Sequence, residues 1–379
     1  MKHRVSLKNS GMRLDHFLMN LYRWRSREQL KRSIETGGIT VIRSGTHYMM
    51  GKMKASFSLQ ATDVVQVLSK RRPEPPVSFD YQILYEDEAI LVVDKPANLP
   101  VHPAGRYFFN TLLIHLKTNG FKESLESPQS FFLVHRIDKE TSGVLLIAKT
   151  LDACRFLTTQ FKERKTDKTY LAIARGEPHA DSFDVDSPIG KIIGSRVGLK
   201  MYSIPIEEGG QSSLTHFKKI ETRSGKLGTF TLMSCYPKTG RQHQIRVHAE
   251  VAGFPLVGDK IYGLNDDEVI AILDYHREKK QTLEEDALDR TLEDEIEDEF
   301  IDELKDDAEV TQEDVKEADV AEIPEDSELV YAELAKRLIL PRHALHAASL
   351  SFTHPTTGMM MTIESKLPQD LRDFFDSLN

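Results

Sequence analysis

The segment FFLVHRIDKETSGVLLIAKT at residues 131–150 constrains this chain more than any other. Two apolar runs, typical of buried strands, flank a polar turn that contains His135, Arg136 and Asp138. Charged groups beside core strands are costly unless they are paired or used in chemistry. The residues therefore indicate either a functional site or a salt-bridged turn, and taken alone they favour neither.

The flanking sequence predicts further strands and one helix. YQILYEDEAILVVDKPANLPVHPAG at 81–105 predicts a hairpin that turns at 86–88 and whose second strand ends at Lys95 and Pro96. KTYLAIA at 168–174 predicts a strand, and HQIRVHAEV at 243–251 predicts a helix. These elements place most of the polar motifs on strands, or on the loops that join them.

Charge is distributed very unevenly along the 379 residues. The formal net charge is −9, yet residues 283–328 alone carry 23 Asp and Glu against three Lys and Arg. That segment contributes −20, so the remainder has a net charge of +11, and residues 1–72 account for all of this excess. The overall negative charge therefore does not exclude a nucleic-acid partner, because the N-terminal module is basic.

The basic module is predicted to contain two short helices followed by strands. GMRLDHFLMNLY at 11–22 has apolar residues at helical spacing, and SREQLKRSIETGG at 26–38 begins with a capping-box pattern. ITVI at 39–42 and DVVQVL at 63–68 predict strands. Clustered Lys and Arg on the second helix favour contacts with phosphates, and a merely solvated helix face is the alternative.

Residues 11–68 resemble the S4 RNA-binding domain, through Arg13-Leu14-Asp15 and through Ser26-Arg27 at the start of the second helix. The chain departs from that family at Arg43-Ser44-Gly45, where Asn-Gly usually follows the first strand. The resemblance implies RNA contact by the basic side chains Arg13, Arg25, Arg27, Lys31 and Arg32. The linker KRRPEPP at 70–76 suits a semi-rigid spacer, so we expect domains at 1–72 and 73–379.

The central segment is similar to the HRLDxxTSGLLLxAK signature of the RluA-type pseudouridine synthases, with Ile137 as a departure. The similarity continues in four further motifs, which are DKPxxLxVHP at 94–103, KTYLAIARGEP at 168–178, TGRQHQIRVHAEVAGFPLVGDKIYG at 239–263 and HALHAASLSFTHP at 343–355. It favours a functional site over a salt-bridged turn. It implies an α+β catalytic domain whose mixed, largely antiparallel central sheet frames a cleft, joined to the small N-terminal S4-like α/β module.

By motif position, the resemblance implies that Asp138 is the catalytic aspartate, Tyr170 the active-site tyrosine and Arg246 the basic partner of the aspartate. Arg136 matches an arginine implicated in base flipping. Alternatively, Arg246 is an ordinary surface residue, or Arg241 is the basic partner of Asp138 in its place. Tyr170 could either stack under the uracil or transfer a proton, and stacking is favoured.

Three further residues are expected to bind the substrate: His135, Arg241 and Leu345. Leu345 would give an apolar contact to the base edge, although an isolated leucine is more often plain core. Arg136 has the length and planarity to occupy the space that an everted base leaves.

The implied reaction breaks the C1′–N1 bond of uridine and makes a C1′–C5 bond, so it needs no redox cofactor and no group donor. A carboxylate, with an ordinary pKa of about 3.9, is ionised at neutral pH and can act as nucleophile or base. The sequence leaves three routes open: addition of Asp138 to the uracil ring, capture of C1′, or removal of the C2′ proton. A neighbouring guanidinium would keep the carboxylate ionised and oriented.

Other classes of function are less well supported. The histidines lack the spacing of a hydrolytic zinc site, and Ser142 is not in a nucleophile elbow, so we expect no metal and no cofactor. RNA is the expected partner, with ribosomal RNA favoured and transfer RNA the alternative. A catalytically silent RNA-binding protein is the main rival, and a metal-dependent hydrolase a more distant one.

The residues also bear on compartment and assembly. The chain has no long apolar run, no secretory signal and only two cysteines, so we expect a cytoplasmic protein that does not interact with a membrane. We also expect a monomer.

An acidic insertion at about 265–340 is the largest departure from the family pattern. Apolar residues recur every four positions from Leu288 to Leu304, which predicts a long acidic helix, and a disordered tract is the alternative. If the insertion packs beside the cleft, it could repel unwanted RNA or compete with RNA for the basic surface. A solvated excursion without a catalytic role is equally compatible with the sequence.

Overall fold

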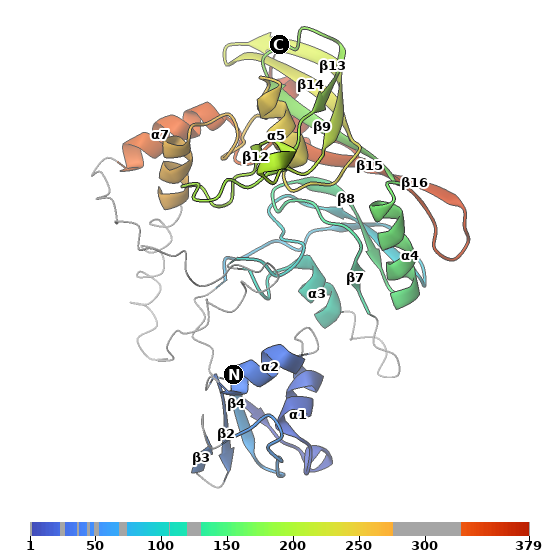
Figure 1. Cartoon of the computed structure of the whole chain (residues 1–379), viewed down its shortest axis with the longest axis vertical. Coiled ribbons are helices and arrows are strands. Elements are labelled where there is room, and N and C mark those ends of the chain that lie inside the picture. Colours follow the sequence, from blue (N-terminus) through green and yellow to red (C-terminus); the bar gives the residue numbers. More distant parts are fainter. Residues whose placement is uncertain are drawn as a thin grey trace. The chain divides into compact units, whose positions relative to one another are not determined.

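The computed structural model describes residues 2–22, 27–35, 38–43, 46–48, 53–67, 74–105, 107–119, 130–275 and 327–378. These residues belong to two compact units, one that extends to Glu74 and one that begins at Pro75 (Figure 1). Within them, no helix combines the length and the apolar character needed to cross a membrane.

The N-terminal unit packs two helices on a four-stranded antiparallel sheet of order β1-β4-β2-β3. Its elements are β1 (Lys2–Arg4), the 3-10 turn η1 (Leu7–Asn9), α1 (Leu14–Leu21), α2 (Arg27–Glu35), β2 (Ile39–Arg43), β3 (Thr46–Tyr48) and β4 (Val64–Val67). Both helices form where the sequence predicts them. Leu14 and Leu18 of α1 and Leu30 and Ile34 of α2 are buried in one core, as their helical spacing requires.

Two buried carboxylates stabilise this unit. Asp15 accepts hydrogen bonds from Arg13 at 2.9 Å and from Arg27 at 3.0 Å, and the bond from Arg13 is the main reason that its pKa falls to about 2. Asp63 is paired with Arg43 at 2.7 Å. Arg13 and Arg27 therefore hold the unit together as well as presenting charge, since both side chains remain substantially exposed.

The larger unit is built on a mixed sheet whose main path is β10-β13-β14-β9-β15-β8-β6-β5, with β7 beside β8 and β16 beside β15. Its strands are β5 (Gln82–Glu86), β6 (Ile90–Lys95), β7 (Phe132–Leu133), β8 (Ser142–Ala148), β9 (Asp167–Arg175), β10 (Ser182–Asp186), β13 (Leu214–Gly225), β14 (Gly228–Pro237), β15 (Leu345–Thr353) and β16 (Met360–Glu364). Only the pairing of β8 with β15 is parallel among these described strands. The predicted α+β fold with a largely antiparallel sheet is confirmed.

The remaining elements of this unit are α3 (Leu112–Asn119), α4 (Leu151–Lys162), the short pair β11 (Ile189–Gly190) and β12 (Tyr202–Ser203), the 3-10 turn η2 (Ile206–Glu208), α5 (Gln244–Val251), α7 (Ser327–Leu338) and α8 (Gln369–Asp376). Residues 266–275 are also helical.

Alternation along the central strands explains why helices cover both faces of the sheet. In β8, Val144 and Leu146 pack in one cluster with α4, whereas Leu145 and Ile147 pack in another with α3. Successive side chains of a strand point to opposite faces, so an uninterrupted apolar run is buried on both sides. Adjacent residues of β9 likewise point to opposite faces of the sheet, because Ala172 faces α5 while Ile173 faces α8.

The two halves of the sheet meet at β8 and β15, where a glycine permits a close approach. Gly143 has a φ of +110°, and a Cβ at this position would lie 2.2 Å from the carbonyl oxygen of Ala347. A side chain here would therefore block the parallel pairing of the two strands. The central motif therefore needs its glycine at this junction, immediately after the loop that carries Asp138.

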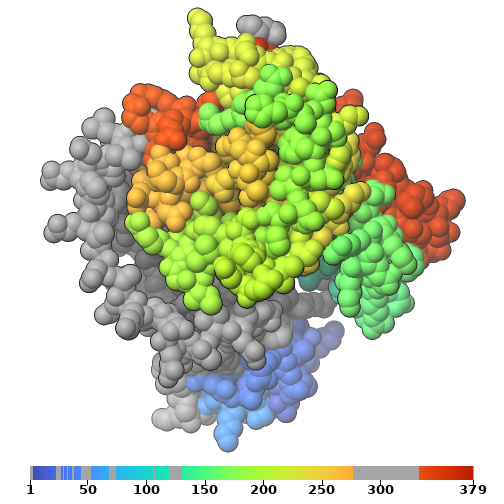
Figure 2. Space-filling model, turned by 45° about the horizontal axis from the view of Figure 1, so that its top comes forward, coloured from blue at the N-terminus to red at the C-terminus, as the bar shows by residue number. Residues whose placement is uncertain are grey.

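The described ends of the insertion pack against each other. Ile272, from helix 266–275, lies in one apolar cluster with Leu334 and Leu338 of α7. Figures 1 and 2 show the two helices side by side, in orange and red-orange. The acidic helix predicted between Leu288 and Leu304 lies outside the described residues.

Candidate active site

A cavity of about 730 Å³ opens on the larger unit, between α4, β9 and α5. Its volume lies in the range of about 300–1,000 Å³ that is usual for small-molecule sites. Seven residues expected from the sequence to form the site line this cavity, namely His135, Arg136, Asp138, Tyr170, Arg241, Arg246 and Leu345. They come from segments far apart in the chain, and the sheet brings them together.

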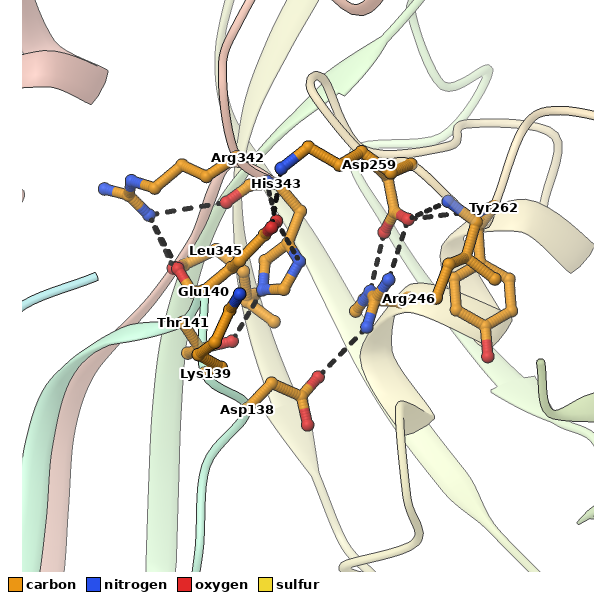
Figure 3. A network of polar contacts seen from close by, with 12 residues as sticks. Asp138, Lys139, Glu140, Thr141, Arg246, Asp259, Tyr262, Arg342, His343 and Leu345 are labelled. Carbon is orange, nitrogen blue, oxygen red and sulfur yellow. Dashed lines mark hydrogen bonds and ion pairs between the residues drawn. The ribbon is translucent and has the colours of Figure 1, made fainter. Parts of the chain in front are cut away.

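A chain of alternating charges runs from the cavity into the interior. Arg246 Nη1 lies 3.2 Å from Asp138 Oδ2, at the cavity wall. On its other side the same guanidinium donates to Asp259, with Nε 2.7 Å from Oδ2 and Nη2 2.8 Å from Oδ1. Such a two-point pair fixes the plane of the guanidinium, so Arg246 meets Asp138 in one orientation (Figure 3).

Asp259 is itself held by the backbone. Its side chain has no exposed surface, and Oδ1 also accepts the N–H groups of Ile261 and Tyr262, both at 3.0 Å. The guanidinium of Arg246 lies over the Tyr262 ring, 4.9 Å from its centroid. Asp138, Asp259 and Tyr262 therefore hold Arg246 in place before any substrate arrives.

The electrostatics keep both carboxylates ionised. Burial opposes the charge on Asp138, but the positive charges of protonated His243 and of Arg246 lower its pKa below the usual value. Burial likewise opposes the charge on Asp259, and Arg246 outweighs it and lowers that pKa well below its ordinary range. Unlike Asp259, Asp138 is accessible, since 29% of its side chain is exposed. It is thus an ionised and reachable carboxylate at neutral pH.

The loop that carries Asp138 is fixed from several sides (Figure 3). Thr141 N–H donates to the Asp138 carbonyl at 3.1 Å, and Thr141 Oγ1 lies 2.8 Å from His343 Nε2. Glu140 is paired with Lys260 at 2.6 Å. These contacts tie residues 138–141 to segments near 260 and 343, so the carboxylate position is set by the fold.

Lys95 also holds the loop that carries Asp138, through a hydrogen bond to its backbone. Its ammonium group is fully buried at the end of β6 and donates to the carbonyl oxygens of Pro96, Leu99 and Lys139 at 2.8, 3.0 and 3.0 Å. Burial lowers its pKa to about 7, although the charge of Asp138 acts in the opposite direction. The DKP motif thus joins two loops through one buried cation.

The matching family model describes RNA pseudouridylate synthase and covers residues 89–251. An uncharacterised RNA pseudouridine synthase of Aquifex aeolicus is 36% identical over 270 residues, which are 68% of this chain and 78% of that protein. The chain belongs to the RNA pseudouridylate synthase family. It is therefore an RNA pseudouridine synthase, an isomerase, as the central motif implied.

Other relatives of the synthase cover more of the chain or have known structures. The ribosomal large subunit pseudouridine synthase D of Zymomonas mobilis is 29% identical over 373 residues, 97% of this chain and 94% of that protein. Human RNA pseudouridylate synthase domain containing 4 superposes with a TM-score of 0.50 at 22% identity, and the match covers 78% of this chain and 92% of the human chain. The human structure supports the fold.

Tyr170 lies on β9 and faces the cavity of the synthase, on the same side of the strand as Ala172. Burial, and then the negative charge of Asp138, raise the pKa of its hydroxyl well above the ordinary value. The phenol is therefore neutral throughout the physiological range and is a poor proton acceptor.

Of the other expected residues, His135 is held by the protein, whereas Arg136 is exposed. His135 Nε2 accepts the N–H of Leu146 at 2.9 Å and its ring stacks on Phe161, with centroids 4.7 Å apart. Burial lowers the pKa of His135 to about 3, so the ring is neutral. Arg136 is exposed at the cavity rim, where Nη1 lies 3.3 Å from His102 Nε2.

Arg241 and Leu345 form other parts of the wall. Arg241 donates from Nε to the Ser212 carbonyl at 3.3 Å, and it is not among the groups within hydrogen-bonding distance of Asp138. Leu345 begins β15 and is almost fully buried in the cluster that contains Ala172. The structure thus places Arg246, and not Arg241, against the aspartate.

The residues expected to bind RNA lie in the N-terminal unit. Arg13 and Arg27 are paired with Asp15 and still partly exposed, and Lys31 is exposed 3.6 Å from Glu28. Arg25 and the side chain of Arg32 lie outside the part of the chain that the structure describes.

The sequence did not single out Asp259, Lys95 or His243 as parts of the site. Asp259 and Lys95 stand inside the quoted motifs, and the cue in each case is a charged residue within an apolar stretch next to Gly or Pro. Burial of such a residue requires a partner, but the sequence does not identify that partner. In the described part of the synthase, no group of three or more His, Cys, Asp or Glu could hold a metal ion.

Proposed function

We propose that this synthase isomerises specific uridines of large-subunit ribosomal RNA, with Asp138 as the catalytic carboxylate. The observation that carries the proposal is the accessible Asp138, held ionised by Arg246 in a cavity large enough for a nucleotide. Ribosomal RNA is favoured because the Zymomonas relative, whose name specifies the ribosomal large subunit, aligns with 97% of this chain, including the basic N-terminal unit.

The substrate uridine is everted from its stack to enter the cavity, which costs a few kcal/mol. Arg136, exposed at the rim, offsets part of this cost by stacking in the space that the base leaves. Inside, Tyr170 stacks on the uracil and Leu345 contacts its edge, while His135 and Arg241 complete the wall. Asp138 then meets the sugar and base at the glycosidic bond.

The chemistry requires only side chains of this synthase. In each of the three routes, ionised Asp138 begins the sequence by attack on C6 or C1′, or by removal of the C2′ proton. The C1′–N1 bond breaks, the uracil turns and a C1′–C5 bond forms. The proton on C5 then passes to solvent, and N1 takes up a proton from solvent. Asp138 is regenerated when its bond to C6 or C1′ breaks or when it returns the proton to C2′. Release of tritium from C5 therefore reports complete turnover.

We further propose that the enzyme acts as a monomer in the cytoplasm. Each proposed catalytic side chain is supplied by one chain, and the presence of only two cysteines fits a reducing compartment.

The choice of RNA is tested with C5-tritiated transcripts of large-subunit ribosomal RNA and of transfer RNA. We expect the purified enzyme to release tritium from the ribosomal transcript at a kcat/KM at least about tenfold higher, one decade being worth about 1.4 kcal/mol of transition-state binding. Higher kcat/KM on transfer RNA would replace ribosomal RNA with transfer RNA as substrate. Absence of release from both would contradict the proposed reaction.

Tyr170→Phe is expected to retain kcat within about tenfold, because the hydroxyl is not a proton acceptor and the ring can still stack on the uracil. Tyr170→Ala is expected to lower kcat/KM by about 10- to 100-fold, because base–aromatic stacking contributes about 1–3 kcal/mol. Tritium release under steady-state conditions measures both variants. A loss in Tyr170→Phe as large as that in Tyr170→Ala would assign the hydroxyl a direct role in proton transfer.

Lys31→Gln is expected to weaken RNA binding and to reduce the slope of log K against log salt by about 0.9, the value for one lost phosphate contact on a duplex. Lys226→Gln, an exposed lysine on the hairpin between β13 and β14, changes the net charge equally and serves as the control. Filter binding from 50 to 200 mM salt gives both slopes. Equal slopes for the two variants would remove Lys31 from the RNA contact surface.

A further inference from the structure

His243 is a titratable side chain of the cavity wall that the proposed chemistry does not yet use. It is the residue immediately before α5, with a φ of +57° and ψ of +17°. Few non-glycine residues adopt this left-handed conformation. Here it turns the imidazole into the cavity beside Asp138 rather than along the helix.

A buried tyrosine fixes the ring. The Tyr262 side chain is almost fully buried, and its hydroxyl oxygen accepts the N–H of Met201 at 3.0 Å. The same hydroxyl lies 2.9 Å from His243 Nδ1, with the two rings edge to face. In the described residues, Nδ1 is the one acceptor within hydrogen-bonding distance of that hydroxyl. A buried O–H donor left without an acceptor costs about 1–3 kcal/mol, so Tyr262 donates to Nδ1.

This hydrogen bond determines the position of the imidazole proton. Burial lowers the pKa of His243 to about 4, although the charge of Asp138 opposes this effect. Arg246 and Arg136 lower the pKa further, and Asp259 raises it. The ring is therefore neutral at pH 7, and because Nδ1 accepts a hydrogen bond, its single proton is on Nε2.

The Nε2–H group has no acceptor of its own in the described protein. The carboxylate oxygen Oδ2 of Asp138 lies 4.0 Å from Nε2, beyond hydrogen-bonding distance. His243 lines the same cavity as Asp138 and Tyr170. An oriented and neutral donor is thus left pointing at the place where a bound uridine meets the carboxylate.

We propose that His243 is a further catalytic residue, which donates a hydrogen bond from Nε2 to a carbonyl oxygen of the uracil. This inference rests on the proposed function. Attack on C6 pushes charge onto the uracil oxygens as an enolate, whereas C1′ capture and C2′ deprotonation both release uracil with the C1′–N1 electron pair. In every route the uracil oxygens become more negative, and a preoriented donor stabilises them more in the transition state than in the ground state.

A matched pair of substitutions separates the donor from its structural role. Asn tolerates positive φ better than most residues, and in His243→Asn its Oδ1 can still accept from Tyr262, but no donor extends to the Nε2 position. In His243→Gln the amide nitrogen can reach that position. We expect His243→Asn to lose about 10²-fold in kcat with KM within about threefold, and His243→Gln to recover at least about tenfold of that loss.

His179→Asn, an exposed histidine in the same unit, controls for the substitution itself and should retain the wild-type kcat. Wild-type kcat in His243→Asn, or equal losses in the Asn and Gln variants, would overturn the inference and leave the proposed function intact. If wild-type enzyme releases no tritium, the proposed function fails first.

Nitrogen NMR of the ¹⁵N-histidine-labelled full-length protein gives a second test that does not depend on the Asn variant folding. The His243 signals are assigned by their loss in His243→Gln. We expect a neutral ring at pH 7 with the proton on Nε2. A proton on Nδ1, or a charged ring at pH 7, would contradict the inference.

Discussion

Asp138→Asn is expected to reduce tritium release from C5-labelled uridine RNA by at least about 10⁴-fold, the upper range for loss of a group that attacks or transfers a proton. Asn has nearly the same shape, but its amide is neither an anionic nucleophile nor a base. RNA affinity should remain within about threefold, because the substituted side chain is one partly buried group in a large RNA-contacting surface.

Asp152→Asn is the matched control. Asp152 lies in the first turn of α4 with 94% of its side chain exposed, so the same chemical change there should leave kcat unchanged. Comparable release by Asp138→Asn and wild-type enzyme would refute the assignment of Asp138. Loss of RNA affinity in parallel with kcat would instead indicate a damaged cavity.

Asp259→Asn is expected to lower the free energy of unfolding at pH 7 by about 3–5 kcal/mol, the usual effect of removing one partner from a buried ion pair. Arg246 would then be buried with only the accessible Asp138 as its anionic partner. Urea denaturation of the two proteins measures the difference, and kcat should fall because Arg246 is no longer held in one orientation.

The stability difference also has a predicted pH dependence. The pKa of Asp259 is lower in the folded protein than in the unfolded chain, where it is about 3.9. Its stabilising effect is therefore complete at pH 5 and above, and it decreases as the pH falls below about 4 towards the folded value. The difference between wild type and Asp259→Asn should shrink in that range.

The pair Arg342–Asp370 supplies the comparison for Asp259. Its geometry is similar, with distances of 2.7 and 3.0 Å, but the Asp370 side chain is 45% exposed. Arg342 is itself buried, but it also donates to the carbonyl oxygens of Glu140, His343 and Leu345, and water can reach the position of Asp370. Asp370→Asn is therefore expected to lower stability by about 1–3 kcal/mol, less than Asp259→Asn. Equal effects of Asp259→Asn and Asp370→Asn would show that burial of the Asp259–Arg246 pair has no special role.

The sequence predicted the parts of this enzyme that depend on local pattern or on a long motif. Apolar alternation located the strands on either side of Asp138, and helical spacing located α1 and α2. The motifs pointed to the residues that the structure gathers around one cavity. Each of these inferences uses residues that are neighbours in the chain or that share a motif.

What the sequence could not supply is the pairing between distant side chains. Arg246 and Asp138 are separated by 108 positions, and Tyr262 and His243 by 19, so their contacts depend on how α5 packs over β9. Arg13 and Arg27 appeared in the sequence only as surface cations, yet both also stabilise buried Asp15. Charge counting cannot distinguish a cation that binds RNA from one that neutralises a carboxylate.

We propose that the carboxylate of Asp138 catalyses the conversion of uridines of ribosomal RNA to pseudouridines. The most direct test maps pseudouridines in large-subunit RNA from cells that lack the gene, complemented with either wild type or Asp138→Asn. We expect at least one position that is pseudouridine with wild type but uridine with the variant and in the uncomplemented cells. Identical maps from all three strains would contradict it.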